Sequence, residues 1–367
     1  ASDVYKRQQN ITDRNHPDET VLTIIQGKGT LPREQAGRNI HYDDASLSNY
    51  KKVEQGDFII HLRSFEGGLE MANEAGIVSP AYTILRCKRP HSSLFYDAYF
   101  HTDEFINHNL SKSVEGIRDG RQISYEAFKW LGIPYCEPTE QEKISTLFSA
   151  FNERIAKQRD LVESLKKYKR GVVKAIMTKQ IRFVDKNGKP YPEWSACTLQ
   201  DAVDFLDGQR KPLESADRAK RQGKYPYYGA SGIIDSIDDY IFDEPLILLG
   251  EDGANIINRS SPLCFIATGK YWVNNHAHVM RPHKGQNIRF LRELLESLDY
   301  TRYNTGTAQP KLNQEKCRTI PLSLPIYEEQ CHIADFLAAL EHKCAQENEE
   351  LEGILQTKNA LMQQLFI

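Results

Sequence analysis

Two similar stretches, IPYCEPTEQEKI at 133–144 and IPLSLPIYEEQCHI at 320–333, decide how this chain is organised. With Gln141 set opposite Gln330, the two copies are offset by 189 residues. A segment that occurs twice in one chain usually marks a structural unit that occurs twice. We therefore expect two domains of similar plan, each followed by the same kind of element.

That element is predicted to be a long helix. After each stretch, apolar residues recur at alternating intervals of four and three, which is the spacing of a coiled-coil seam. Such a helix of about 40 residues is about 60 Å long, well beyond the usual globular helix. The seam positions are Ile144, Phe148, Phe151, Ile155, Gln158, Val162, Leu165, Lys169, Val172 and Ile176 in the first copy, and Ile333, Leu337, Leu340, Cys344, Glu347, Leu351, Ile354, Lys358, Leu361 and Leu365 in the second.

Two polar residues interrupt each seam, and they stand at matching places. Gln158 corresponds to Glu347, and Lys169 corresponds to Lys358. The first helix has a clear start, because TEQE at 139–142 follows a proline and has the form of a capping box. The second helix is expected to begin just after Pro325.

The charges of the two predicted helices indicate their partner. Residues 139–178 contain nine Lys/Arg and five Asp/Glu, whereas residues 328–367 contain two Lys/Arg and eight Asp/Glu. Opposite charge favours pairing of the two helices with each other, while the apolar seam holds the pair together. A roughly antiparallel pair would place the two domains at opposite ends, related by a pseudo-two-fold axis. The basic run from Lys166 to Lys174 could serve this pairing or could contact nucleic-acid phosphates.

Composition limits the class of protein. The chain has 367 residues and a net charge of −3, and no run of 18 apolar residues predicts a transmembrane helix. No secretory signal is visible, so we expect a cytoplasmic protein. The seven cysteines are scattered without a CxxC motif, which indicates neither a disulfide framework nor a zinc site. The net charge does not favour nucleic-acid binding, but a local basic face would be enough for it.

The repeat divides the chain into domains and connections. Residues 1–8, ASDVYKRQ, fit no strand or helix pattern and are interpreted as a possible non-native scar, outside the fold. The segment 179–192 contains Asn187-Gly188 and two prolines, which is typical of a turn-rich linker. The predicted parts are a first domain at 9–137, a spacer helix at 138–178, the linker at 179–192, a second domain at 193–325 and a C-terminal helix at 326–367.

Inside the two domains the order of short motifs also repeats. GDFIIHLRSFEGG (56–68) is similar to EPLILLGEDGA (244–254), and GIVSPAYTILR (76–86) is similar to YWVNNHAHVMR (271–281). GIRDGRQISYEAF (116–128) likewise parallels NTGTAQPKLNQEK (304–316). These patterns predict mixed strands and short helices, an α+β unit used twice. TLQDAVDFLDGQRKPLES (198–215) has no counterpart before Val21, so the first domain is expected to lack its opening strand or two.

With these motifs the chain resembles the DNA-specificity subunit of type I restriction–modification systems. The resemblance rests on the two-domain, two-helix order together with YPYYGASG (225–232), LGEDGA (249–254), VNNHAHV (273–279), GTAQPKLNQ (306–314) and EEQCHIADFLAALE (328–341). It implies that each globular domain is a target-recognition domain that reads one half of a split site in double-stranded DNA. It also implies that the helices set the spacing and dock methyltransferase subunits, and that motor–nuclease restriction subunits join the assembly. The specificity subunit itself carries no catalysis and needs no cofactor.

The residues give no independent indication of an enzyme. An amino-methyltransferase would need a cofactor loop and an Asn/Asp-Pro-Pro-aromatic motif, and neither occurs. QGKGT at 26–30 lacks the upstream glycine of a P-loop and is interpreted as a turn. Glu251-Asp252 is not followed by ExK, so a nuclease metal site is not predicted. His276 and His278 would share one face of a strand, but packing or a polar contact is preferred to metal binding.

Residue types within the repeated turns indicate which side chains are candidates for DNA contact. Base edges are read by Arg, Lys, Asn, Gln, Ser and Thr, and phosphates by Lys, Arg, Tyr and backbone N–H groups. The candidates are Tyr227, Tyr228, Ser231, Asn274, Asn275, Gln309 and Lys311 in the second domain, and Arg63, Ser64, Ser79, Arg121 and Gln122 in the first. For Tyr227 and Tyr228 a place in the core is an equally good interpretation.

A second class of function stays open. The chain could be a coiled-coil scaffold whose two α+β domains bind proteins, which its nearly balanced charge would suit. Binding to DNA that weakens steeply with salt would separate the two hypotheses, since phosphate contacts release counterions.

Overall fold

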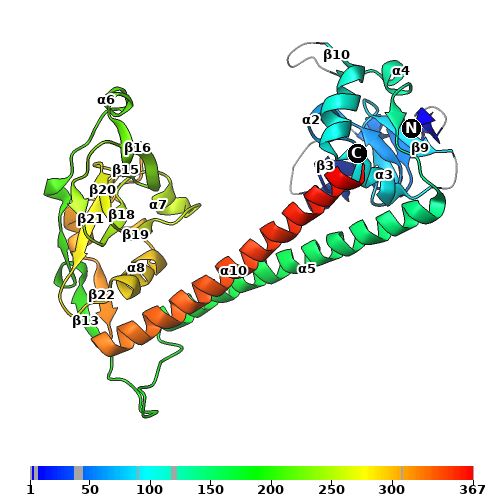
Figure 1. Ribbon diagram of the computed structural model, residues 1–367. Helices are drawn as coiled ribbons and strands as arrows, with labels where there is room; N and C mark the ends of the chain where they lie inside the picture. Colours follow the sequence, from blue (N-terminus) through cyan, green and yellow to red (C-terminus); the bar gives the residue numbers. More distant parts are fainter. Residues whose placement is uncertain are drawn as a thin grey trace. The chain divides into compact units, whose positions relative to one another are not determined.

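The computed structural model describes residues 2–3, 7–36, 44–88, 91–116, 122–306 and 309–366. The chain forms two compact units, one of residues 1–161 with 347–367 and the other of residues 162–346. Two long helices, α5 (Pro138–Met177) and α10 (Tyr327–Leu365), contribute to both units, and each is drawn as one continuous helix in Figure 1. No helix in the described part of the chain is both long and apolar enough to cross a bilayer.

The first unit contains short strands and short helices in addition to its parts of α5 and α10. They are β1 (Ser2–Asp3), β2 (Gln8–Ile11), β3 (Leu22–Ile25), β4 (Gly29–Pro32), β5 (Lys51–Val53), β6 (Phe58–Ile60), α2 (Ser64–Gly67), β7 (Glu70–Met71), β8 (Gly76–Val78), β9 (Thr83–Cys87), α3 (Ser93–Phe100), β10 (Val114–Glu115), β11 (Gln122–Ile123), α4 (Tyr125–Phe128) and β12 (Gly132–Ile133).

The second unit has longer strands. Its elements are β13 (Ser195–Thr198), β14 (Val203–Phe205), α6 (Ser215–Lys220), β15 (Gln222–Gly229), β16 (Gly232–Ile237), β17 (Phe242–Asp243), β18 (Leu246–Gly250), α7 (Asn255–Asn258), β19 (Cys264–Ala267), β20 (Lys270–Val273), β21 (Ala277–Pro282), α8 (Ile288–Ser297), α9 (Gln314–Arg318) and β22 (Pro321–Leu324).

The central sheets of the two units share one topology. The order is β2-β9-β6-β7 in the first unit and β14-β21-β18-β19 in the second, and every neighbouring pair is antiparallel. β6 and β18 come from the motifs at 56–68 and 244–254 that the sequence comparison aligned. The repeat seen in the sequence is therefore also a repeat of strand order.

The expectation that the first domain lacks its opening strands was wrong. β1 pairs with β12 just before α5, as β13 pairs with β22 just before α10, and β2 takes the sheet position of β14. Part of the segment 1–8, which was interpreted as lying outside the fold, supplies β1 and the buried Gln8 at the start of β2. A two-residue strand and the polar stretch QQNI carry too little pattern to be recognised before their partners are known.

One ion pair recurs at the same place in both sheets. Arg86 on β9 binds Asp57 through Nε (2.9 Å) and Nη2 (2.7 Å), and Asp57 immediately precedes β6. In the second unit Arg281 on β21 binds Glu244 through Nε at 3.0 Å and through Nη2, two residues before β18. Two parallel N–H···O bonds fix the orientation of both partners. The pair therefore fastens the same two strands together in each unit.

A buried glutamine joins each long helix to its own domain. In the first unit Gln141 donates to the carbonyl oxygen of Cys136 (2.9 Å) and accepts from the backbone N–H of Ser92 (3.2 Å), the N-cap of α3. In the second, Gln330 donates to Pro325 O (2.9 Å) and accepts from the N–H of Asn287 (2.8 Å), the N-cap of α8. Both glutamines are 1% exposed. The glutamine shared by the two opening motifs therefore has the same structural role in both units: it links a long helix to the N-cap of a short helix.

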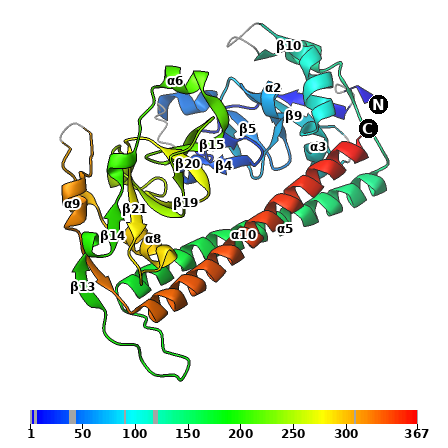
Figure 2. The same ribbon diagram turned by 60° about the vertical axis from the view of Figure 1, so that its left-hand side comes forward.

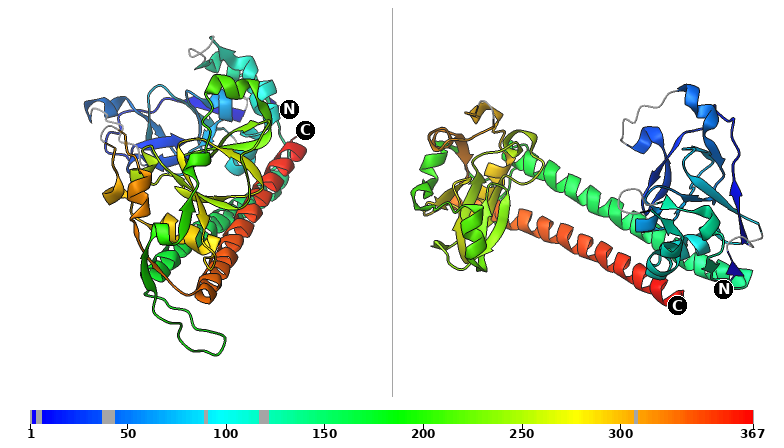
Figure 3. Two further views of the ribbon diagram at one scale, coloured as in Figure 1. Left: turned by 90° about the vertical axis from the view of Figure 1, so that its left-hand side faces the viewer. Right: turned by 90° about the horizontal axis from the view of Figure 1, so that it is seen from above.

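Within the first unit, α5 and α10 run antiparallel. Phe148 clusters with Met362 and Ala98, and Ile155 clusters with Leu351 and Ile354. The end of α10 lies against the first domain (Figure 3). There the Phe366 ring contacts Phe95 and Tyr99. The apolar seam expected from the 4-3 spacing is thus buried between the helices.

The first polar break of each seam forms one cross-helix contact. Gln158 Nε2 donates to the backbone oxygen of Glu347 (2.9 Å) and to its carboxylate (2.7 Å). A polar pair inside an apolar seam disfavours any register in which it is unmatched. Arg154 and Glu350 add an exposed ion pair at 3.0 Å, in agreement with the opposite charges of the two helices.

Within the second unit, α5 and α10 are again antiparallel and pack on the domain core. Val172 and Ile176 belong to the same cluster as Ile333 and Leu337. α8 lies beside the helix pair (Figure 2), and Lys169 pairs with Glu341 at 3.3 Å. At least one residue of the basic run on α5 is therefore engaged with the acidic helix.

We predict that Gln330→Ala lowers the free energy of unfolding by about 2 kcal/mol or more, because it leaves a buried N–H and a buried carbonyl without partners. Urea denaturation followed by circular dichroism would measure this. Gln346→Ala, at an exposed position of the same helix, is the control and should change stability by less than about 0.5 kcal/mol. Equal effects of the two substitutions would contradict the role given to Gln330.

Candidate functional site

Four loops of the second unit meet at the end of strand β18. They carry the motifs at 225–232, 249–254, 273–279 and 306–314. Asn274 N–H donates to Tyr228 O (3.0 Å), and Glu251 N–H donates to His276 O (2.8 Å). Gly253 N–H donates to Pro310 O at 3.0 Å, which ties in the fourth loop. Backbone hydrogen bonds thus collect segments that lie far apart in the sequence.

Close packing at the end of β18 requires a glycine at position 250. A Cβ placed on Gly250 would lie 2.6 Å from the carbonyl oxygen of Ala230 and 2.8 Å from Leu263 Cδ1. Such distances are impossible for a real side chain without a shift of the backbone. Gly250 therefore allows the turn at 230–231 to approach the end of β18.

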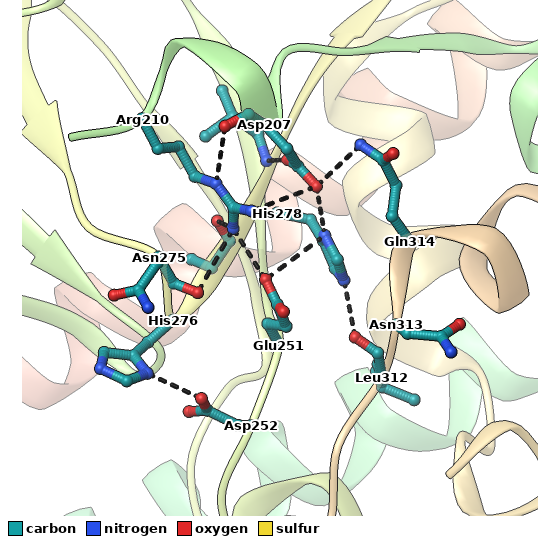
Figure 4. Close-up of polar contacts among 12 residues, drawn as sticks. Asp207, Arg210, Glu251, Asp252, Asn275, His276, His278, Leu312, Asn313 and Gln314 are labelled. Carbon is teal, nitrogen blue, oxygen red and sulfur yellow. Dashed lines mark hydrogen bonds and ion pairs between the residues drawn. The ribbon is translucent and has the colours of Figure 1, made fainter. Parts of the chain in front are cut away.

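A buried histidine holds the fourth loop in place (Figure 4). His278 is 1% exposed, and its two ring nitrogens lie 2.7 Å from Asp207 Oδ2 and 2.9 Å from Leu312 O. Asp207 also accepts from Val279 N–H (2.9 Å) and from Gln314 Nε2 (2.9 Å). Since both partners of the ring are acceptors, both ring nitrogens carry protons. The imidazolium links β21 to the segment that follows Gln309.

The contact between His278 and Asp207 shifts the pKa of both groups. Burial lowers the pKa of His278, but the hydrogen bond to Asp207 more than compensates and raises it to about 10. Burial would raise the pKa of Asp207, yet the hydrogen bond from His278 brings it below its ordinary value. The pair is therefore charged over a wide pH range.

A second pair completes the cluster. Arg210 Nη1 lies 2.8 Å from Glu251 Oε2 and donates to Ala277 O at 2.7 Å. Lys311 Nζ lies 3.3 Å from Glu251 Oε1, and Leu312 N–H donates to Glu251 O at 2.7 Å. The carboxylate of Glu251 thus places Lys311 at the rim of the cluster, with its side chain half exposed.

The cluster contains residue types that bind metals, but their polar atoms already have hydrogen-bond or ion-pair partners. Ligand atoms of Asp207, Glu251 and His278 lie within 4.8 Å of one another. However, both nitrogens of His278 are hydrogen-bonded, and Arg210 supplies a positive charge between the two carboxylates (Figure 4). A divalent ion would have to displace these partners, so we interpret the group as an ion-pair network. His276 lies outside it, exposed and bound to Asp252 at 2.7 Å.

The predicted contact residues of the second domain separate into two groups. Tyr227 (0% exposed) and Asn274 (4%) are buried, and Tyr228 is half-buried against Phe265. The Tyr227 hydroxyl accepts from Leu213 N–H (3.0 Å), so its polar end is used internally. These three residues support the loops from below. The exposed members are Ser231, Asn275, Gln309 and Lys311.

The predicted residues of the first domain are distributed in the same mixed way. Arg63 is exposed, but Ser64 is 0% exposed and its hydroxyl accepts from His61 N–H (2.9 Å). Gln122 is exposed on β11, which contacts α2. Ser79 is half-buried, and Arg121 lies outside the described residues. Ser64 is therefore too buried to make a contact at the surface, and its prediction as a contact residue was wrong.

Three exposed lysines were not selected from the sequence. They stand around helix α6, at the opposite end of β15 from Ser231 (Figure 1). In the sequence these lysines belong to a basic run, RKPLESADRAKRQGK at 210–224, which could have indicated them. Its arginines Arg218 and Arg221 pair with aspartates on or beside β16. The exposed lysines are Lys211, Lys220 and Lys224.

Comparison with known proteins agrees with the motifs of the second domain. Residues 191–356 match the family described as the type I restriction modification DNA specificity domain. The putative type I restriction enzyme specificity subunit S.HindORF215P of Haemophilus influenzae is 32% identical over 148 residues, 40% of this chain and 37% of that protein. The EcoprrI specificity subunit of Escherichia coli is 26% identical over 141 residues, 38% of this chain and 34% of that protein. The chain thus covers only about a third of these two relatives.

More distant similarities extend over most of the chain. The MjaVIII specificity subunit of Methanocaldococcus jannaschii is 22% identical over 343 residues, 86% of this chain and 79% of that protein. The crystal structure of an S subunit from M. genitalium shares the fold with a TM-score of 0.58 at 15% identity, covering 100% of this chain and 95% of the other. A chain from a study of assembly and conformational transition of the type I R-M system gives 0.60 at 14% identity, covering 100% and 96%.

Fold and motifs together define a repeated α+β protein with paired long helices. Residues 191–356 match the type I restriction modification DNA specificity domain, and the chain shares its fold with solved S subunits of type I systems.

We predict that His278→Gln destabilises the protein most near pH 6 and progressively less towards pH 10. A histidine whose pKa rises on folding contributes fully below its unfolded pKa of about 6.5 and loses this contribution as the pH passes its folded value of about 10. The measurement is the unfolding free energy of wild type and variant across this range.

His342→Gln, at an exposed position of α10, is the control for this experiment. It should give a small difference that does not change with pH. A constant difference for His278→Gln would mean that His278 is not charged in the folded protein.

Proposed function

We propose that this chain is the DNA-reading subunit of a type I restriction–modification complex. One observation carries the proposal: exposed Ser231, Asn275, Gln309 and Lys311 stand on loops that backbone hydrogen bonds and a buried ion-pair network gather at one end of the second domain. Amide, hydroxyl and ammonium groups are the types that read base edges and phosphates. Rigid support beneath them reduces the entropy lost on binding.

The repeated plan supports a site in two halves. The first domain has the same sheet order and the same arginine–carboxylate pair, but most residues in its loops differ, Gln122 excepted. Each domain would then read one half-site, and because the loops differ, the two half-sites would differ in sequence. The exposed lysines Lys211, Lys220 and Lys224 extend the second domain's surface with charges suited to phosphate contacts.

The long helices would act as the spacer between half-sites and as the docking surface for methyltransferase subunits, with restriction subunits joining the larger assembly. Support for a spacer comes from two helices of 40 and 39 residues, each shared by both units. In this role the chain carries no catalysis of its own and requires no cofactor.

The direct test is a selection from random DNA duplexes, using the full chain together with the methyltransferase subunit of its own system. We expect two short enriched sequences separated by a fixed gap. A single contiguous motif would contradict the two-half-site proposal. No enrichment by a correctly assembled complex would favour a protein-binding scaffold, for which DNA affinity would lack a steep dependence on salt.

We predict that Gln309→Ala weakens or relaxes recognition of one half-site only, by about 1–3 kcal/mol if the amide makes a bidentate base contact. Gln122→Ala is the matched variant, because Gln122 is the exposed equivalent in the first domain and should affect the other half-site. Competition binding with duplexes altered in one half-site would show this. Loss at both half-sites from either variant would count against these assignments.

We predict that a heptad inserted into both helices lengthens the preferred gap by up to about three base pairs, since seven residues add about 10 Å. The insertions belong between 161 and 162 in α5 and between 346 and 347 in α10, where they leave the contacts inside each unit intact. The same selection would measure the gap. Seven residues inserted at the 187–188 turn serve as the control, and an unchanged gap in the helix variant would remove the spacer role.

A further inference from the structure

A cavity of about 490 Å³ lies inside the first unit, between the first domain and the paired helices. On the domain side it is lined by the turn at 27–29, by Glu70 and by helix α3. On the helix side it is lined by α5 and α10, with apolar residues such as Phe148, Ile155 and Met362. Its volume is within the range of sites for small ligands, and an apolar wall faces a charged one.

The glutamate in this cavity is already neutralised. Glu70 is 1% exposed and accepts hydrogen bonds from Gly27 N–H (2.6 Å) and Gly29 N–H (2.9 Å), while His101 Nε2 lies 3.6 Å away. Both glycines have positive φ, which turns successive N–H groups towards one anion. Burial lowers the pKa of His101, but Glu70 and Asp97 raise it to about 9, so His101 is charged.

The remaining charged groups are not satisfied in this way. Lys358, on α10, is half-buried, and no carboxylate oxygen of a described residue lies within 4.0 Å of its Nζ, although Asp97 in the same lining attracts it electrostatically. Arg159, on α5, likewise has no ion pair in the described part of the chain. The side-chain amides of Asn152 and Asn359 make no hydrogen bond to another described residue. Lys358 is half-buried and Arg159 is exposed, so an anion beside them would supply the ion pair that Lys358 lacks.

The internal repeat provides a comparison within the same molecule. Lys169 in the second unit is the equivalent of Lys358, and its partner Glu341 is the equivalent of Asn152. Glu341 bridges Lys169 (3.3 Å) and Arg292 (3.3 Å), the residue of α8 at the place of Asp97 in α3. In the second unit the chain thus supplies its own anion for the lysine. In the first unit Asn152 stands there instead, and Asp97, at the place of Arg292, lies 3.6 Å from His101 and forms no ion pair with Lys358 within 4.0 Å.

The charge of the lining indicates the ligand. Four cations, Lys28, His101, Arg159 and Lys358, face two carboxylates, of which Glu70 is occupied. We propose that this cavity binds a small organic anion, a carboxylate or phosphate ester on an apolar body, with Lys358 and Arg159 as its cationic contacts. The apolar body lies against the seam residues of the helix pair, and the free amides of Asn152 and Asn359 bind its polar atoms. The site does not depend on DNA recognition.

The test is calorimetric titration of the full chain with hexanoate and with AMP, beside the uncharged hexanol and adenosine. We expect saturable millimolar or tighter binding of at least one anion, and binding of its neutral analogue weaker by at least about tenfold. Binding of hexanoate alone identifies a carboxylate ligand, and binding of AMP alone identifies a phosphate ester. Absence of saturable binding by both anions overturns the proposal.

Two variants separate binding from folding. Lys358→Met removes the half-buried charge, and Asn152→Glu introduces the carboxylate that Glu341 provides to Lys169 in the second unit. Each should abolish anion binding and leave the melting temperature unchanged or raised, because each removes or pairs a half-buried cation that has no ion pair. Lys174→Met, at an exposed position of α5, is the control and should bind as wild type does. Undiminished binding by both cavity variants would place the ligand elsewhere and reject this site.

Discussion

The arrangement of this protein depends on a buried glutamine amide that is used once in each unit. Gln141 and Gln330 each connect the first turn of a long helix to the N-cap of a short helix in the adjoining domain. A primary amide suits this position because it donates and accepts at once and carries no charge that would need a buried counterion. The direction in which each long helix leaves its sheet follows from this link.

Buried charge serves two different purposes in the two units. In the second unit His278, Asp207, Arg210 and Glu251 satisfy one another, so the network acts as a support for the loops above it. Breaking one member of such a network is costly because its partner is left buried and unpaired. In the first unit Lys358 lines a cavity together with Glu70 and Asp97, but among the described residues neither carboxylate forms an ion pair with it, and this is where we propose that an anion binds.

Repetition with divergence connects the fold to the proposed function. Strand order, the arginine–carboxylate clamp and the glutamine link recur in both units, because they form the scaffold. Most loop residues at the ends of the strands differ between the units, whereas Gln122 and Gln309 match. A protein that reads two unlike half-sites with one architecture requires this combination of a constant scaffold and variable loops.

The sequence by itself determined the long helices, their pairing and the repeat, because a 3.5-residue apolar period and opposite charge are local properties of the chain. It also identified the motifs that converge at the end of β18. Only the tertiary structure decided which side chains of those motifs reach the surface: Tyr227, Asn274 and Ser64 are buried, whereas Asn275 and Gln309 are exposed. It also revealed β1 and β2, the charged state of His278 and the cavity beside Lys358. Burial and charge pairing depend on neighbours that are distant in sequence, and no local pattern contains them.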